Sequence, residues 1–470
     1  MKKLALLVLF IIIIQITVIS QCPNHVYFTT QEQVDNFPID YPNCTEMNGY
    51  IYIEGNNIVN LNGLSALTFI GQELYIRNNS ALTSLSGLNN LTEIGGFLDI
   101  SNNDLLTSMA GLDKLTSVGD FIDFSDNDAL ISLSGLDSLV SIGVTLSISN
   151  NNLLTNLTGL ENLVSVGLFT YISENDALIN LTGLASLNTA GEDALYIVDN
   201  NALTSLNGLE HMTYMEGGLY ISNNDSLSNM TGLNNLDSVG GELIVQNNLG
   251  LDSLFGLNNL NTIAGDLLLS GNYFMSSLSG IENLTSIGGD LKISNCNQLK
   301  NLIGLDNLKS IGGILNIEEN NLLENLTGID SIEAASISDL SIIYNPLLSY
   351  CEVKSICDYL SNPNGDITVY VNATGCNNSV EIEEACTVSL YENTRITDLV
   401  IFPNPVNNIL NIKNKYNETL KVNIYNQLGQ QTLSKTGIIK RIDISRLQRG
   451  IYVIELISNN LRLREKLIVK

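Results

Sequence analysis

The chain is poor in the residues that most enzymes rely on. Its 470 residues include no tryptophan, two histidines and seven prolines. The two histidines, His25 and His211, lie far apart in the sequence. We predict that His25 belongs to an N-terminal cap and that His211 is exposed to solvent. All seven prolines fall outside residues 51–345. A long region without proline is typical of a backbone whose N–H groups are all paired.

Recognisable catalytic patterns are also missing from the sequence. No Ser/His/Asp grouping, phosphate-binding glycine loop, His-x-x-x-His pair or Cys-x-x-Cys pair can be assembled from neighbouring segments. Carboxylate pairs are abundant, and counting them does not exclude a glycosidase-like pair. We predict that the protein is not an enzyme and holds no cofactor and no catalytic metal.

Basic residues are scarce and unevenly placed. Lys and Arg number 21 against 49 Asp and Glu, for a net charge of −28. Residues 401–470 hold 12 of the basic residues and 4 of the acidic ones, so this tail carries +8 and the remainder −36. Such an acidic surface repels phosphates, which argues against a nucleic-acid partner.

The seven cysteines fall into two groups at the ends of the proline-free region, with one cysteine between them. Cys22 and Cys44 precede the region, four others follow it (Cys351, Cys357, Cys376, Cys386), and Cys296 lies inside it. In an exported chain this arrangement predicts one disulfide before the region and two after it, closing two caps. The last four cysteines can pair in three ways. Their spacings do not match a zinc site.

A Gly-Leu or Gly-Ile dipeptide recurs throughout the region between the caps. It begins at Gly63, Gly87, Gly111, Gly135, Gly159, Gly183, Gly208, Gly232, Gly256, Gly280, Gly304 and Gly328, always 24 residues apart except for one spacing of 25 between Gly183 and Gly208. A period this regular predicts a solenoid, in which each unit buries its apolar face against its neighbours. Any binding function is then expected on an extended surface.

Each unit contains an alternating segment and a segment of period three. In one copy Leu98 and Ile100 are predicted to point inward and Asp99 and Ser101 outward, as in a short strand that stacks into a parallel ladder. Leucines at every third position then suit extended or 3₁₀-like backbone. The closing Ile-Gly-Gly is expected to supply positive φ where the chain turns back.

From Gly87 onward, an asparagine stands eight residues before each repeated glycine except Gly304, which has a cysteine there. The column comprises Asn79, Asn103, Asn127, Asn151, Asn175, Asn200, Asn224, Asn248, Asn272, then Cys296, then Asn320. An amide at a sharp bend can satisfy backbone groups that the turn leaves unpaired. We therefore predict an internal ladder of amides, with Cys296 as a buried structural thiol.

The outward position of the predicted strand is the best candidate for a binding surface. Down the stack it reads Tyr52, Tyr75, Asp99, Asp123, Ser147, Tyr171, Tyr196, Tyr220, Ile244, Leu268, Lys292 and Asn316. Tyr171, Tyr196, Tyr220, Ile244 and Leu268 form an apolar strip suited to protein or sugar contacts. The alternative is that these side chains only stabilise the sheet.

The predicted bends are rich in acidic residues, as in Asp126-Asn127-Asp128 and Glu174-Asn175-Asp176. Rows of such oxygen ligands could hold Ca²⁺. No bidentate glutamate or nonapeptide glycine pattern recurs, which favours solvated loop acids instead.

Residues 51–345 resemble the leucine-rich repeats, and the pattern Leu-x-x-Leu-x-Gly-Leu-x-x-Leu-x-x-Ile-Gly-Gly-x-Leu-x-Ile resembles the receptor L domains of growth-factor receptors. The resemblance implies a mainly β fold: a single-stack solenoid with a parallel sheet and about 12 repeats of 24 residues. Cysteine in place of the ladder asparagine also fits leucine-rich repeats. The resemblance says little about the ligand, because leucine-rich-repeat and L-domain proteins bind proteins, glycans and other molecules through different surfaces.

The tail has a separate resemblance. It is similar to the C-terminal sorting domain of type IX secretion substrates of Bacteroidota. The similar segments are Phe402-Pro403-Asn404-Pro405, the run 422–429, the run 447–453 and the final 466–470. That family implies a small β-sandwich over 401–470, interaction with the type IX machinery, and release or attachment at the outer cell surface. An ordinary ligand-binding sandwich is the alternative.

The N-terminal residues Met1 to Ser20 have the pattern of a signal peptide, with cleavage near Ser20. Gln21 is too large for the residue that precedes a lipidated cysteine, which argues against lipidation at Cys22. We divide the rest into an N-terminal disulfide cap (21–50), repeats (51–345), a C-terminal disulfide cap (346–386), a linker (387–400) and the sorting domain (401–470). No membrane span is expected in the mature chain.

Together these features predict a secreted or cell-surface repeat protein that binds an extracellular protein or glycan, with adhesion as its use. The alternative is a structural surface-layer or matrix component without a defined ligand.

Overall fold

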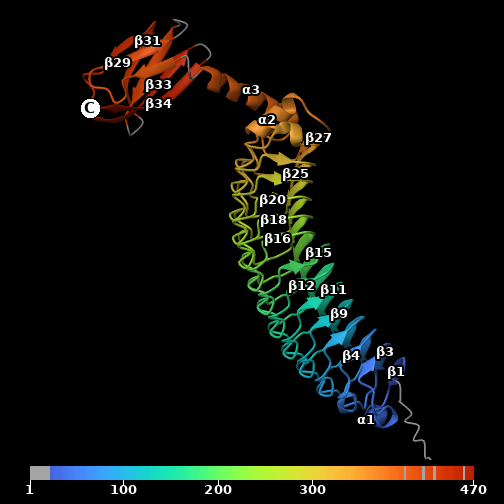
Figure 1. Ribbon diagram of the computed structural model, residues 1–470. Coiled ribbons are helices and arrows are strands. Elements are labelled where there is room, and N and C mark those ends of the chain that lie inside the picture. Colours follow the sequence, from blue (N-terminus) through green and yellow to red (C-terminus); the bar gives the residue numbers. More distant parts are fainter. Residues whose placement is uncertain (1–21, 396–398, 415–418, 427–429, 459–460) are drawn as a thin grey trace, which may run out of the picture.

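The computed structural model describes residues 22–395, 399–414, 419–426, 430–458 and 461–470. The predicted signal peptide lies outside these residues. The chain forms a curved solenoid followed by a smaller β domain (Figure 1).

A parallel sheet of 15 strands, in sequence order, runs the length of the solenoid. Its strands are β1 (His25–Phe28), β3 (Tyr50–Ile53), β5 (Leu74–Arg77), β7 (Leu98–Ser101), β9 (Phe121–Ser125), β11 (Thr145–Ser149), β13 (Phe169–Ser173), β15 (Ala194–Val198), β17 (Gly218–Ser222), β19 (Leu243–Gln246), β21 (Leu267–Ser270), β23 (Leu291–Ser294), β25 (Leu315–Glu318), β26 (Leu340–Ile343) and β27 (Ile367–Tyr370). The prediction of a parallel-sheet solenoid is confirmed. The sheet begins before residue 51 and ends after 345, because β1 and β27 belong to the two caps.

The segment that follows each run of period three forms a second set of strands, which the sequence did not reveal. One sheet contains β2 (Glu46–Met47), β4 (Phe69–Ile70), β6 (Glu93–Ile94), β8 (Ser117–Val118), β10 (Ser141–Ile142), β12 (Ser165–Val166) and β14 (Thr189–Ala190). Another contains β16 (Tyr214–Met215), β18 (Ser238–Val239), β20 (Thr262–Ile263), β22 (Ser286–Ile287) and β24 (Ser310–Ile311). The break between β14 and β16 falls in the coil with the one 25-residue spacing.

The repeated glycines serve two different purposes. Gly111 of the Gly-Leu dipeptide has φ +119°, which side chains rarely adopt. Gly119 of the Ile-Gly pair lies so close to the preceding coil that a Cβ there would sit 2.0 Å from the Gly95 oxygen. The expectation of positive φ at Ile-Gly-Gly was therefore wrong except at Gly191, where φ is +121°. Close stacking of backbones explains the other glycines of this motif.

One hydrophobic core fills the solenoid from Phe28 to Cys386. The inward residues Leu98 and Ile100 are fully buried, as predicted. Asp99 and Ser101 lie on the outer side of the sheet but are also buried, at 1% and 5% exposed, because neighbouring side chains cover them.

The predicted asparagines form an internal ladder that is interrupted at Cys296. Asn127 is typical: its Nδ2 donates to the Ile100 and Ser125 carbonyls at 2.8 and 3.0 Å, and its Oδ1 accepts from the Asn103 N–H at 3.1 Å. Each amide thus binds one coil to the next. Every asparagine of the column is fully buried.

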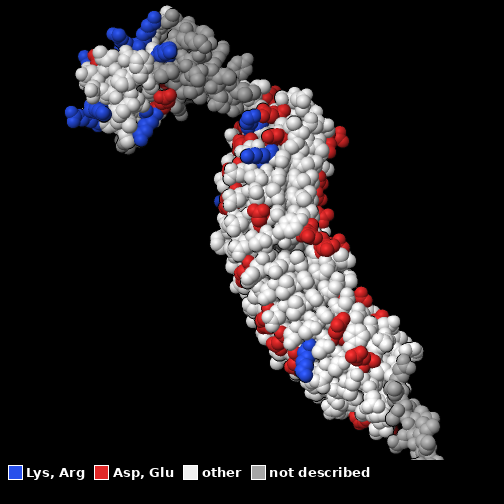
Figure 2. All heavy atoms as spheres, viewed as in Figure 1, with Lys and Arg blue, Asp and Glu red and all other residues white. Residues whose placement is uncertain are grey.

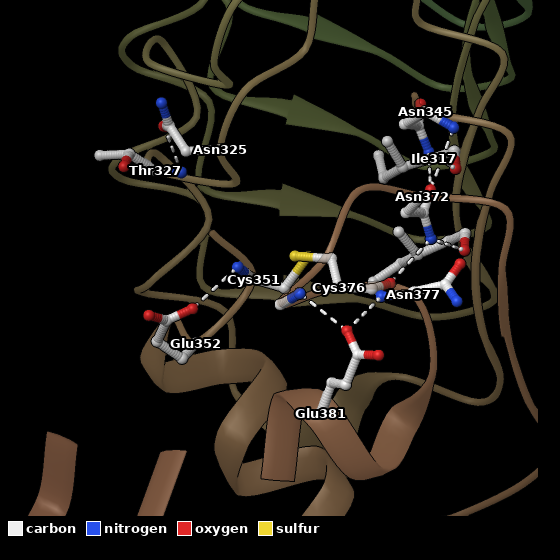
Figure 3. The surroundings of a disulfide bond; sticks show 12 residues. Ile317, Asn325, Thr327, Asn345, Cys351, Glu352, Asn372, Cys376, Asn377 and Glu381 are labelled. Atoms are coloured by element: carbon white, nitrogen blue, oxygen red, sulfur yellow. Dashed lines mark hydrogen bonds between the residues drawn. A yellow bond between two sulfur atoms is a disulfide. The ribbon is translucent and has the colours of Figure 1, made fainter. Parts of the chain in front are cut away.

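The ladder continues beyond Asn320 into the C-terminal cap. The Asn320 N–H donates to Asn345 Oδ1, and the Asn345 N–H donates to Asn372 Oδ1, both at 3.0 Å. Asn372 Nδ2 then donates to the Cys376 carbonyl at 3.0 Å, beside a disulfide (Figure 3). Glu381 accepts from the Asn377 N–H in the same cap. The spacing of 24 ends at these residues, which is why the sequence column stopped at Asn320.

Three disulfides close the two ends. They join Cys22 to Cys44, Cys351 to Cys376, and Cys357 to Cys386. One disulfide before the array and two after it were predicted, and both are confirmed.

Helices occur mainly at the caps. Helix α1 (Gln31–Asp40) begins at Thr30, which forms a capping box with Gln33, and packs Val34 and Phe37 into the core. Helix α2 (Lys354–Ser361) covers the other end. Single 3₁₀ turns occur at η1 (Asn62–Leu64) and η2 (Ala334–Ser336). Helix α3 (Ser379–Arg395) begins in the cap and continues through 387–395, so most of the predicted linker is helical.

The tail contains two antiparallel sheets around a single core. One holds β28 (Leu399–Phe402), β29 (Ile409–Asn414) and β32 (Arg441–Asp443); the other holds β30 (Leu420–Tyr425), β31 (Gln431–Gly437), β33 (Gly450–Ser458) and β34 (Leu461–Val469). No helix of the described residues is long and apolar enough to cross a membrane.

Candidate functional site

The outer side of the 15-stranded sheet presents parallel rows of side chains, to which each strand contributes two or three outward residues. The strands lie toward the inner side of the bend in Figure 1. The central row contains Tyr171, Tyr196 and Tyr220, which the strand register places opposite one another. It is flanked on one side by a row that includes Phe121 and Phe169.

The three tyrosines form a stack of parallel rings. Ring centroids of Tyr171 and Tyr196 are 4.7 Å apart, and those of Tyr196 and Tyr220 are 4.4 Å apart. The interplanar angles are 8° and 16°. Each ring therefore covers the face of its neighbour, and the stack offers a partner its edges and its two end faces.

The stack is anchored at its β17 end. The Tyr220 hydroxyl donates to the Glu242 carboxylate. Burial, followed by this hydrogen bond, raises the pKa of Tyr220 well above its ordinary value. Tyr220 therefore stays a neutral donor at any physiological pH.

Ile244 and Leu268 continue the strip, and the register aligns both with Tyr220. All five predicted strip residues are half-buried. Close packing between neighbouring coils covers part of each side chain. Lys292 follows and forms an ion pair with Glu318, and Asn316 lies beside it.

A second aromatic group lies toward the N-terminal cap. The Phe97 and Phe121 rings stack with centroids 4.3 Å apart, and Tyr75 meets Phe97 edge-on at 4.6 Å. Tyr52 packs on Tyr75 at 5.2 Å, and His25 stacks on Tyr50 at 5.3 Å. His25 thus belongs to the N-terminal cap as predicted.

Two carboxylates interrupt the central row between the aromatic groups. The register pairs Asp99 of β7 with Asp123 of β9. Arg77 forms an ion pair with Asp99, and its guanidinium lies 4.6 Å from the centroid of Tyr75. Burial, and then the charge of Asp99, raises the pKa of Asp123.

Another row of carboxylates, farther along, binds backbone. Oδ1 of Asp266 accepts from the Asp290 N–H, and Oδ1 of Asp290 accepts from the Ile314 N–H, both at 2.7 Å. Oδ1 of Asp339 accepts from the Asp366 N–H in the same way. These acids therefore have a structural role on the sheet.

A hollow of about 320 Å³ lies on the other side of the coils, at the break between β14 and β16. Its lining includes Val166, Gly191, Tyr214, Met215 and Glu216. Gly191 and its neighbours accommodate the extra residue of the 25-residue spacing. Sequence reasoning noted the irregular spacing without predicting this hollow.

The remaining candidates lie elsewhere. His211 is exposed in a turn, far from the other histidine in the sequence. Cys296 occupies the ladder position and is fully buried, and burial raises the pKa of its thiol to about 12.

Several bend acids have a conformational role that the sequence did not suggest. Asp126, Glu174 and Asp199, which directly precede ladder asparagines, take φ of 56°. In the described part of the chain, no group of three His, Cys, Asp or Glu side chains could hold a metal ion.

The solenoid and the tail domain differ in the sign of their charged residues. Figure 2 shows Asp and Glu along the solenoid and a gathering of Lys and Arg on the tail domain. This matches the opposite net charges of the two regions in the sequence.

A family model for the secretion system C-terminal sorting domain matches residues 400–470. No curated protein matches the chain. The sorting domain marks a protein that type IX secretion exports and that is released or attached at the cell surface. It also implies an interaction with the type IX machinery.

Proposed function

We propose that the protein is a non-enzymatic recognition protein of the cell exterior, which binds an extracellular protein or glycan through the outer face of its 15-stranded sheet. Adhesion to surfaces is the use that this location favours. The observation that carries the proposal is the strip of Tyr171, Tyr196, Tyr220, Ile244 and Leu268, which the register places on consecutive strands.

Several features support this face. Tyrosine combines apolar area with a polar tip, which suits both proteins and sugars. The parallel rings are held in one orientation by each other and by the Tyr220–Glu242 bond, so they lose little freedom on binding. Type IX export brings this face to the cell exterior.

The alternative is a structural surface-layer or matrix component, in which the stack only stabilises the sheet. The two proposals differ in what substitution of the strip does. A structural component loses stability, whereas a recognition protein loses a ligand.

The test compares two sets of tyrosine substitutions in the full chain. Tyr171, Tyr196 and Tyr220 are changed to Ser in one variant, and the exposed Tyr214, Tyr273 and Tyr350 are changed to Ser in the control. Both are applied to glycan and surface-protein arrays, and their melting temperatures are measured. We expect array signals to fall about tenfold in the strip variant alone while both proteins remain folded. Equal signals in the two folded variants, or no signal for the native protein, would favour the structural component.

A further inference from the structure

One arginine of the chain already occupies a cation site on the sheet face. The Arg77 guanidinium lies against the Tyr75 ring at 4.6 Å and pairs with the Asp99 carboxylate. Asp99 is on the strand next to Tyr75. An aromatic face and a carboxylate on neighbouring strands are thus sufficient, on this sheet, to hold a guanidinium.

A second carboxylate follows at the next strand without a cation of its own. Asp123 accepts from the Ser125 hydroxyl at 3.3 Å, and its carboxylate also has a side-chain hydrogen bond with Ser147. Its charged neighbours on the face are Asp99, which repels it, and Arg77, whose ion pair is with Asp99. Lys114 is the single Lys or Arg in the sequence between Arg77 and Lys292, and it donates to Asn90 Oδ1 at 2.8 Å.

The strand after Asp123 carries only small outward side chains, which form a gap between the larger side chains of the row. The outward residues of β11 are Thr145, Ser147 and Ser149, all small and hydroxylated. The register places Ser147 between Asp123 and Tyr171. The tyrosine stack therefore ends at Tyr171, whose neighbour on the next strand is Ser147 and whose ring lies 5.8 Å from the Phe169 ring on its own strand.

The spacing of this gap suits a planar cation. Neighbouring parallel strands are about 4.8 Å apart, so a group above Ser147 lies about that distance from both Asp123 and Tyr171. This matches the separation of the Arg77 guanidinium from Tyr75. Phe121 and Phe169 flank Thr145 on the adjacent row and add apolar walls.

We propose that the surface over Ser147, bounded by Asp123 and Tyr171, binds the guanidinium of an arginine presented by a protein partner. In this site the carboxylate and the ring lie two strands apart, with Ser147 between them, whereas Tyr75 and Asp99 beside Arg77 are on neighbouring strands. The inference rests on the proposed function, since it names the partner chemistry that the sheet face recognises.

Charge and shape both favour arginine. The region outside the tail carries −36, which attracts a basic partner and repels an acidic one. Guanidinium is flat and stacks on aromatic rings, whereas ammonium is compact and strongly hydrated. The raised pKa of Asp123 supports the same conclusion, because a buried carboxylate gains from a cation that replaces lost water.

The test uses the full chain and two small peptides. Acetyl-Gly-Arg-Gly-amide is titrated into the protein by calorimetry, and its neutral counterpart with citrulline in place of arginine serves as the matched ligand. We expect the arginine peptide to bind at least tenfold more tightly. Asp123→Asn should weaken its binding about tenfold, and Ser147→Tyr, which extends the stack into the gap, should abolish it.

Asp104→Asn is the control variant, because it removes the same charge from an exposed bend. It should leave the affinity unchanged. Three results would overturn the site. The first is equal affinity for the two peptides, and the second is an equal effect of Asp123→Asn and Asp104→Asn. The third is binding of an oligosaccharide that Ser147→Tyr blocks and Asp123→Asn does not. The arrays separate this failure from that of the proposed function. If the tyrosine variant loses a partner on the arrays while the native protein binds the arginine and citrulline peptides equally, the proposed function holds and only the arginine site is wrong.

Discussion

The backbone N–H of Asn103 donates to the side-chain oxygen of Asn127 at 3.1 Å, and the same relationship recurs from one coil to the next along most of the solenoid. Most of the amides also donate two hydrogen bonds to carbonyls, as Asn127 does to Ile100 and Ser125. The ladder therefore satisfies buried backbone groups at every bend, where strand pairing has ended.

Asn127→Ala removes an acceptor and a donor from the middle of the ladder. It leaves the Asn103 N–H and the Ile100 carbonyl buried without their partner, which we expect to cost about 3 kcal/mol of unfolding free energy. Denaturant unfolding measures this loss. The control is Asn152→Ala, since Asn152 is exposed and its side chain makes one contact of 3.5 Å with Asn150. Equal stabilities of the two variants would contradict the role of the ladder.

Thr170 occupies a core position that is apolar in the neighbouring coils. Its Oγ1 is buried and lacks a hydrogen-bond partner within the described structure. Thr170→Val removes the unsatisfied hydroxyl and keeps the shape, so we expect a gain of about 1 kcal/mol in unfolding free energy. Thr145→Val on the outer face of β11 is the control and should change little. A loss of stability in Thr170→Val would show that the hydroxyl is bonded.

Cys296 should behave as an inert thiol in the folded protein. Because burial raises its pKa to about 12 from 9.0, iodoacetamide should fail to modify it at pH 9 until the protein unfolds. Mass spectrometry with and without denaturant measures the modification.

The same shift affects stability at high pH. The unfolded thiol loses its proton above about pH 9 while the folded thiol keeps it, so folding stability falls as pH rises from about 9 toward 12. Cys296→Ala should lessen this fall. Rapid labelling of the folded protein at pH 9 would contradict the burial.

Deletion of Phe402 to Lys470 removes the sorting domain. We expect the truncated protein to accumulate in the periplasm, because the type IX machinery has lost its recognition element. Fractionation and immunoblotting against the full chain in the same strain locate the two proteins. Appearance of the truncated chain outside the cell would remove the sorting role of the tail.

The repeating parts of the fold could be predicted from the sequence because each recurs at a regular spacing. A spacing of 24 residues recurs for glycines such as Gly111, for inward pairs such as Leu98 and Ile100, and for the asparagine column. When similar coils stack, residues at this spacing lie next to one another on neighbouring coils. The disulfides followed from the two groups of cysteines at the ends, whereas their pairing required the structure.

The other features of the fold and the site depend on side-chain contacts that the repeat spacing does not determine. The burial of Asp99 results from Arg77 and its neighbours, and the positive φ of Asp126 and Glu174 results from the way each bend closes. The tyrosine strip was identified by position alone. The parallel stacking of its rings emerged from the structure.

The most direct test of the central claim maps the partner's position on the protein. Hydroxyl-radical footprinting of the full chain is compared with and without a partner recovered from the arrays. We predict protection of Tyr171, Tyr196 and Tyr220 on the sheet face, with Tyr214 and Tyr273 unchanged. Protection confined to Tyr214 and the opposite side of the coils, or to the tail, would contradict recognition through the 15-stranded sheet.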